Sequence, residues 1–231
     1  MNLLAIETAT ECCSVALLAG ADLIVRSEIA PRRHAELLLP MCDAVLAEAG
    51  LSRHVLDAIA VGRGPGAFTG VRLAISAAQG IALALDLPVI AVSSLAALAL
   101  DAPADDAPVL AVIDARMGEI YAGTFRRSAD GLVEAIGSES VGPAAALTLP
   151  ARRAWNVIGT GWESYRDVLL ARMEGPPRWA EGQRYPQAGA VARLAAPRFM
   201  AGLGVAPELA LPVYLRDKVA LTSSEQRLAR G

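Results

Sequence analysis

The sequence is poor in lysine, histidine and aromatic residues, and each shortage excludes a class of protein. Of the 21 basic residues only Lys218 is a lysine, so no P-loop lysine follows a glycine-rich turn and a Walker-type NTPase is excluded. The two histidines, His34 and His54, lack the spacing of metal ligands. Aromatic residues make up 4% of the chain, which argues against a base-stacking platform for nucleic acid.

Cysteines are also few, and their positions do not suggest disulfides. Cys12 and Cys13 are neighbours and Cys42 stands alone, and no signal-peptide pattern opens the sequence. We therefore expect a reduced, cytoplasmic protein. The most apolar window, 81–100, is interrupted by a charged residue and a proline, so we expect no membrane span.

The sequence is rich in apolar residues. It has 231 residues, 54% of them hydrophobic, and a net charge of −3, which excludes a disordered chain and fits one large domain or two small lobes. Acidic residues outnumber basic ones by 24 to 21, so binding of nucleic acid by bulk charge is not expected. Alanine supplies much of the apolar excess, and codon bias in a GC-rich genome is its simplest explanation.

The order of predicted elements indicates an α/β fold. Three closely spaced strands predict an antiparallel meander, and the strands that follow are linked by helices. This order is that of a ribonuclease-H-like lobe, so we predict an actin-like ATPase (ASKHA) fold with two such lobes, the second reduced. The predicted strands of the first lobe are 3–6, 14–18, 23–29, 58–62 and 89–92, and its predicted helices are 35–49, 69–85 and 94–100.

A polar, proline-marked stretch at 101–108 separates the lobes, which we place at 1–102 and 103–231. In the second lobe we expect a C-terminal helix over 188–203, kinked or divided at Pro197 and packed back on the first lobe, and a frayed tail. The other elements predicted there are strands at 109–113, 119–125 and 156–159 and a helix near 164–173.

Two segments could contact an anion or a nucleotide. The first is the turn after the first strand, and the second is the glycine-rich run 62–70, which leads into a helix N-terminus where backbone amides favour anions. A tight packing turn explains the glycines equally well, and polar residues at 114–119 could bind a ligand or form surface pairs. The candidate contacts are Glu7, Thr8, Thr10, Gly64, Gly66, Thr69, Arg72, Asp114 and Arg116.

The helix predicted over 69–85 is apolar on nearly every face. Such a helix is either buried in a core or covered by a partner. Its small residues would allow a second helix to approach closely, so we interpret it as a partner interface, with core burial as the alternative.

Four motifs resemble the bacterial TsaB (YeaZ) family. They are AIETATECCSVAL at 5–17, GPGAFTGVR at 64–72, DARMGEIYA at 114–122 and PVYLR at 212–216. The resemblance spans nearly the whole chain and is densest in the first lobe. It implies a non-catalytic subunit that binds and activates TsaD, the enzyme that forms N6-threonylcarbamoyladenosine (t6A) beside the anticodon of tRNAs reading ANN codons.

The resemblance also implies how the subunit assembles. TsaE would join the complex, tRNA would be held through the other subunits, and the first two helices would contact TsaD or, without it, a second copy of the chain. The partner-binding residues carried over in this way are Leu38, Met41, Val45, Ala74, Ala77 and Ala78.

Two departures argue against chemistry in this chain. TsaD-like enzymes hold a metal with paired histidines on the first helix, whereas His34 is followed one turn later by Leu38, and Glu7 stands where the family usually has Asp. We therefore expect no catalytic residue, metal or cofactor, and leave a nucleotide at the partner interface open. The alternatives are a stand-alone actin-like ATPase or kinase, a glycoprotease-like peptidase, and a ligand-sensing module built on Asp114 and Arg116.

Overall fold

The first sheet is a meander extended by two parallel strands. The predicted meander consists of β1 (Asn2–Glu7), β2 (Cys12–Ala19) and β3 (Asp22–Ile29). β4 (Ala58–Gly62) and β5 (Val89–Val92) add in parallel on the other side of β1, which gives the order β3-β2-β1-β4-β5. This is the topology of a ribonuclease-H-like lobe.

The second sheet repeats this topology with shorter strands. β7 pairs antiparallel with β6, while β10 and β11 add in parallel on the other side of β6. In place of a helix before β10, the described residues contain only the short 3-10 helix Ala144–Ala146. The predicted fold of two lobes with a reduced second lobe is therefore confirmed. The strands are β6 (Val109–Arg116), β7 (Glu119–Arg127), β8 (Val133–Ala135), β9 (Ser140–Pro143), β10 (Asn156–Ile158) and β11 (Trp179–Glu181).

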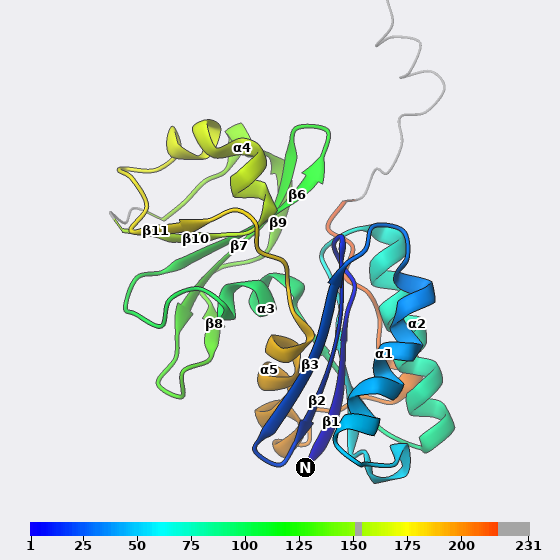
Figure 1. Cartoon of the computed structure of the whole chain (residues 1–231). Coiled ribbons are helices and arrows are strands. Elements are labelled where there is room, and N and C mark those ends of the chain that lie inside the picture. The colour runs from blue at the N-terminus through cyan, green and yellow to red at the C-terminus, as the bar shows by residue number, and fades with distance from the viewer. Residues whose placement is uncertain (151–153, 217–231) are drawn as a thin grey trace, which may run out of the picture.

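The computed structural model describes residues 1–150 and 154–216 (Figure 1). α1 (His34–Glu48) and α2 (Phe68–Leu85) cover one face of the first sheet, and α5 (Ala188–Met200) covers the other. The alternation of strand side chains produces two cores, because Leu4 and Ile6 face α1 and α2 while Leu3 and Ala5 face α5.

The lobes exchange the helix that follows their last strand. α3 (Ser94–Leu100) comes after β5 of the first sheet, yet Leu95 and Leu98 pack against Val109 and Phe125 of the second. α5 comes after β11 of the second sheet and packs on the first. α4 (Thr160–Leu170) stays on its own sheet. Each lobe is therefore completed by a segment from the other.

The C-terminal segment returns to the first lobe after α5. Val205 forms a two-bond bridge with Val89, and the 3-10 helix Pro207–Leu209 packs beside α2. We call residues 205–216 the C-terminal strap. The predicted frayed tail, 222–231, lies outside the described residues.

Two helices have different bounds in the structure from those predicted. α5 runs without interruption through Pro197 and ends at Met200. The proline lies in the last turn, so little of the helix follows it and a kink there would redirect only the residues up to Met200. α4 begins at Thr160, four residues earlier than predicted, directly after Gly159, whose φ of 112° is open to glycine.

Within 1–150 and 154–216, α2 is the one helix long and apolar enough to cross a membrane. It buries Val71, Ala74, Ala78 and Ala82 against the first sheet, the packing of a core helix in a globular domain.

Candidate functional site

The glycine-rich loop packs directly on the turn after β1. A Cβ atom at Gly62 would lie 2.0 Å from Glu7 Oε2, and one at Gly70 would lie 2.0 Å from the Thr8 carbonyl oxygen. A Cβ atom at Gly66 would lie 2.3 Å from the Ala9 carbonyl oxygen. The glycines are thus required for close packing of two loops, which favours the packing interpretation over a phosphate cradle.

The residues of that turn are buried and already hydrogen-bonded. The Glu7 carboxylate accepts hydrogen bonds from the Ala9 amide at 2.7 Å and from Ser94 Oγ at 2.6 Å. Burial raises the pKa of Glu7, although these donors favour its ionised form. Thr8 Oγ1 donates to the Gly70 carbonyl at 2.7 Å. Glu7, Thr8 and Gly64 are thus buried, and the two side chains are hydrogen-bonded within the fold, which favours a packing role over the predicted contact with an anion.

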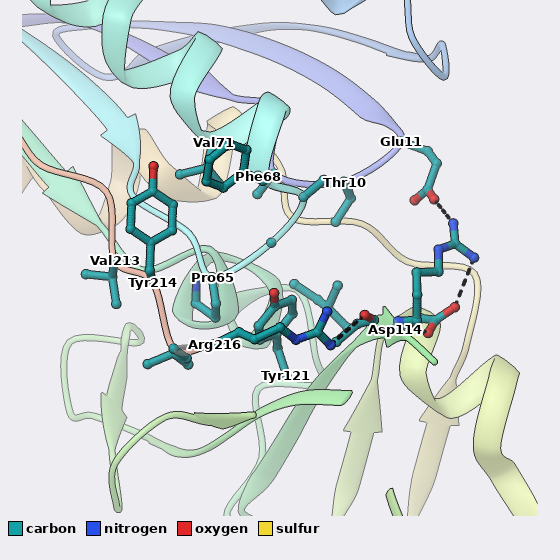
Figure 2. A pocket seen from close by; sticks show the side chains of 17 residues that line it. Thr10, Glu11, Pro65, Phe68, Val71, Asp114, Tyr121, Val213, Tyr214 and Arg216 are labelled. Carbon is teal, nitrogen blue, oxygen red and sulfur yellow. Dashed lines mark hydrogen bonds and ion pairs between the residues drawn. The ribbon is translucent and has the colours of Figure 1, made fainter. Parts of the chain in front are cut away.

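Four other predicted residues do meet in a cleft between the lobes. Thr10 and Gly66 reach it from the first lobe, and Asp114 and Arg116 reach it from the second (Figure 2). The cavity has a volume of about 180 Å³, smaller than the roughly 300–1,000 Å³ of typical sites for drug-sized ligands. The structure therefore brings these candidates together around a cavity below the usual volume of a ligand site, next to a groove of about 600 Å³ that shares Thr10 and Arg116.

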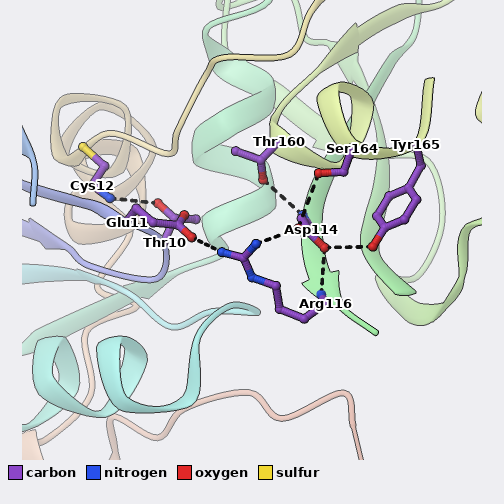
Figure 3. A network of polar contacts seen from close by, with 8 residues as sticks. All are labelled: Thr10, Glu11, Cys12, Asp114, Arg116, Thr160, Ser164 and Tyr165. Atoms are coloured by element: carbon purple, nitrogen blue, oxygen red, sulfur yellow. Dashed lines mark hydrogen bonds and ion pairs between the residues drawn. The ribbon is translucent and has the colours of Figure 1, made fainter. Parts of the chain in front are cut away.

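The charges in the cleft are paired with one another. Arg116 forms ion pairs with Glu11 across the cleft and with Asp114 at 3.1 Å (Figure 3). Asp114 also accepts hydrogen bonds from Tyr165 Oη at 3.1 Å and from the Arg116 amide at 2.8 Å. Desolvation and the Asp114 charge raise the pKa of Tyr165, which keeps the phenol a donor. These pairs leave little positive charge for a phosphate.

The C-terminal strap closes another side of the cleft. Tyr214 and Arg216 line the cavity (Figure 2). Arg216 also pairs with Glu119. Sequence reasoning missed Glu11, Tyr214 and Arg216 as cleft residues. The PVYLR motif was visible, but nothing in it indicates which part of the fold it contacts.

The last two candidate anion contacts lie outside this cavity. The Arg72 guanidinium stacks 3.8 Å from the centroid of the Phe68 ring, and its Nε donates to Tyr214 Oη at 2.5 Å. Thr69 is exposed and lines a neighbouring groove together with His34. Among the described residues no group of three or more His, Cys, Asp or Glu side chains could hold a metal ion.

Most of the predicted partner-binding residues are buried, which is a correction to the sequence-based prediction of the partner surface. Leu38, Val45, Ala74 and Ala78 are at most 1% exposed because they form the core between the helices and the first sheet. Met41 and Ala77 are partly buried against the same core. Ala74 and Ala78 therefore bring α2 close to the first sheet.

Other apolar side chains of the two helices do face outward. Leu83 is 74% exposed and Leu39 is 55% exposed, and a groove of about 450 Å³ between α1 and α2 is lined by Leu39, Ile81 and Ala84. We call Leu39, Ile81 and Ala84, which line this groove, and Leu83, which is exposed on α2 but does not line it, the α1–α2 face. The apolar character of α2 was visible in the sequence, but the buried and exposed sides could not be told apart.

Comparisons with known proteins agree on one family. Residues 25–166 match the family model described as TsaD, tRNA N6-adenosine threonylcarbamoyltransferase. The tRNA threonylcarbamoyladenosine biosynthesis protein TsaB of Escherichia coli K12 is 39% identical over 225 residues, which cover 95% of this chain and 96% of that protein. The TsaB protein of Haemophilus influenzae is 37% identical, with 95% of each chain covered.

Solved structures give the same result. YeaZ from Pseudomonas aeruginosa is 44% identical, with a TM-score of 0.85 over 93% of this chain and 99% of that one. A second structure with the same values is described as an uncharacterized protein with similarity to peptidase YEAZ.

Proposed function

The chain belongs to the TsaB (YeaZ) family, and we propose that it is a non-catalytic subunit for t6A synthesis that binds and activates a TsaD-type partner. The observation that carries this proposal is the α1–α2 face. Leu83 is 74% exposed and Leu39 is 55% exposed, although the opposite sides of their helices pack against the first sheet. Exposed leucines of this kind are typical of a surface that a partner covers.

The shared fold supports the choice of partner. The match to the TsaD family model runs from residue 25 to residue 166 and includes both α1 and α2. A TsaD-type partner therefore has an equivalent pair of helices, and the two pairs would pack across a pseudo-two-fold axis. The same argument supports a homodimer through this face when TsaD is absent.

The cleft supports a role without catalysis. Its volume of about 180 Å³ is small for a nucleotide, and Arg116 and Arg216 are both paired with carboxylates. We infer that activation acts through helix packing on TsaD, that the chain needs no cofactor of its own, and that TsaE and tRNA join through the assembly in the cytoplasm. The net charge of −3 agrees with a minor part in holding tRNA.

A cysteine-dependent peptidase is less well supported than a subunit. Burial raises the pKa of the Cys13 thiol to about 11 and that of Cys42 to about 12. Cys12 is also buried, and burial raises its pKa as well. A thiol with a raised pKa is protonated at neutral pH and is a poor nucleophile.

Reconstitution of tRNA modification tests the proposal. TsaD and TsaE of the same organism are incubated with threonylcarbamoyl adenylate and a tRNA that reads ANN codons, with this chain, without it, or with the L83E variant. We expect t6A formation to be lost without the chain and to fall at least about tenfold with L83E. M200E, at a side chain 73% exposed on the opposite side of the first sheet, is the matched control. Equal t6A yields with and without the chain would contradict the proposal.

A further inference from the structure

The C-terminal strap is fastened to the first lobe along its length. Val205 bridges to Val89 through hydrogen bonds of 2.9 and 3.0 Å, and Gln79 Nε2 donates to the Ala210 carbonyl at 3.2 Å. The Val213 amide donates to the Arg63 carbonyl at 2.9 Å. The strap therefore moves with the first lobe.

The end of the strap crosses to the second lobe. Arg216 Nη2 donates to the Ala115 carbonyl at 2.9 Å and pairs with Glu119, so it holds both strands of the β6–β7 hairpin. Only 23% of the Arg216 side chain and 32% of the Glu119 side chain are exposed, which limits screening by solvent.

Arg116, the last residue of β6 in the same hairpin, crosses in the opposite direction. Its guanidinium pairs with Glu11 of the first lobe (Figure 3). Arg116 and Met117 have φ values of 63° and 58°, a left-handed conformation that is costly for residues other than glycine. The Asp114 carboxylate holds this turn by accepting the Arg116 amide at 2.8 Å.

A third contact joins the lobes near the glycine-rich loop. Arg63, at the end of β4, lies 3.5 Å from Glu139 of the second lobe, and Ser93 Oγ donates to the same carboxylate. Glu139 is only 13% exposed. Three arginine–carboxylate pairs thus join the two lobes, each with one partner held by each lobe.

We infer that the strap and the β6–β7 hairpin form a clasp, made by Arg216 with Glu119 and Arg116 with Glu11, that holds the two lobes in one relative orientation and keeps the cleft closed. Two-lobed proteins commonly open and close about a hinge. Here arginines hold one hairpin from two sides, so the lobes move as one body. This inference does not depend on the proposed partner, because every contact in it lies within one chain.

Distance measurement by pulsed EPR tests the clasp. The full chain is spin-labelled at A21C, in the exposed β2–β3 turn, and at D167C, on the exposed side of α4, and is diluted with unlabelled protein so that only distances within one molecule are measured. The native cysteines are buried. We expect one narrow distance distribution for the parent, and for R116A/R216A a distribution shifted or at least about twice as wide.

The matched control is R126A. Arg126 is 69% exposed, like Arg116 at 70%, but pairs with Glu134 inside the second lobe, so its removal should leave the distribution unchanged. If R116A/R216A does not fold, as judged by circular dichroism, E11Q/E119Q removes the same pairs and keeps side-chain size. A distribution for the clasp variant that superimposes on that of R126A would overturn the inference.

Discussion

At the scale of single residues, Glu7 shows how a position suited to ligand chemistry can serve the fold. Its carboxylate lies under the glycine-rich loop, where Gly62 leaves room for it, and accepts hydrogen bonds from Ala9 and Ser94. Glu7 therefore joins the turn after β1 to Ser94, and its carboxylate is satisfied within the fold.

Replacing this carboxyl by an amide should change how stability depends on pH. Burial raises the pKa of Glu7 above its ordinary value of 4.5, so the folded state binds more protons than the unfolded state above that pH, and stability falls as pH rises through this window. E7Q removes this loss because the amide has no charge. We expect E7Q to gain stability relative to the wild type as pH rises from 4 to 7.

Urea unfolding at pH 4, 5.5 and 7 measures the effect. E174Q, at an exposed loop residue, is the control and should show no such trend. If the difference in the free energy of unfolding between E7Q and the wild type stays constant over this pH range, the ionisation of Glu7 does not destabilise the folded state as predicted.

At the scale of elements, long and periodic segments could be predicted and short ones could not. The bounds of β4, β5 and α3 agree with the prediction because apolar runs and Ser93, which caps α3, mark them. The strands β8, β9 and β11 have only three or four residues, too few for a period to show. The orientation of α2 could not be predicted either, because its apolar residues cover nearly every side.

Two glycines of α2, Gly70 and Gly80, allow the effect of close packing on stability to be distinguished from the effect of helix propensity. A Cβ atom at Gly70 would lie 2.0 Å from the Thr8 carbonyl oxygen, whereas one at Gly80 would meet nothing within 4 Å. We expect G70A to destabilise the protein by about 1–3 kcal/mol through overpacking. We expect G80A to stabilise it by about 0.5–1 kcal/mol because alanine favours the helix. Thermal and urea unfolding check both values, and a stabilising G70A would contradict the close packing of the loop.

At the scale of the whole molecule, the two lobes depend on each other. They exchange α3 and α5, and the strap returns from the second lobe along the first. The contacts of Arg116 with Glu11 and of Arg216 with Glu119 join residues about a hundred positions apart. Local patterns carry no information on such pairs, so the sequence pointed to Asp114 and Arg116 but not to their partners.

The exposed surface of the whole molecule has two distinct sides. α1 and α2 cover one face of the first sheet and α5 covers the other (Figure 1). An interaction through the α1–α2 face should therefore be sensitive to changes at Leu83 and insensitive to changes at Met200, although the two side chains are almost equally exposed, at 74% and 73%.

The affinity for TsaD of the same organism, measured by isothermal titration calorimetry with L83E and M200E, tests this account most directly. We expect L83E to raise Kd at least about tenfold, or about 1.4 kcal/mol, with an unchanged melting temperature, because Leu83 lies outside the core. M200E should bind like the wild type. Equal affinity of L83E and the wild type, or a loss with M200E alone, would contradict the α1–α2 face as the partner surface.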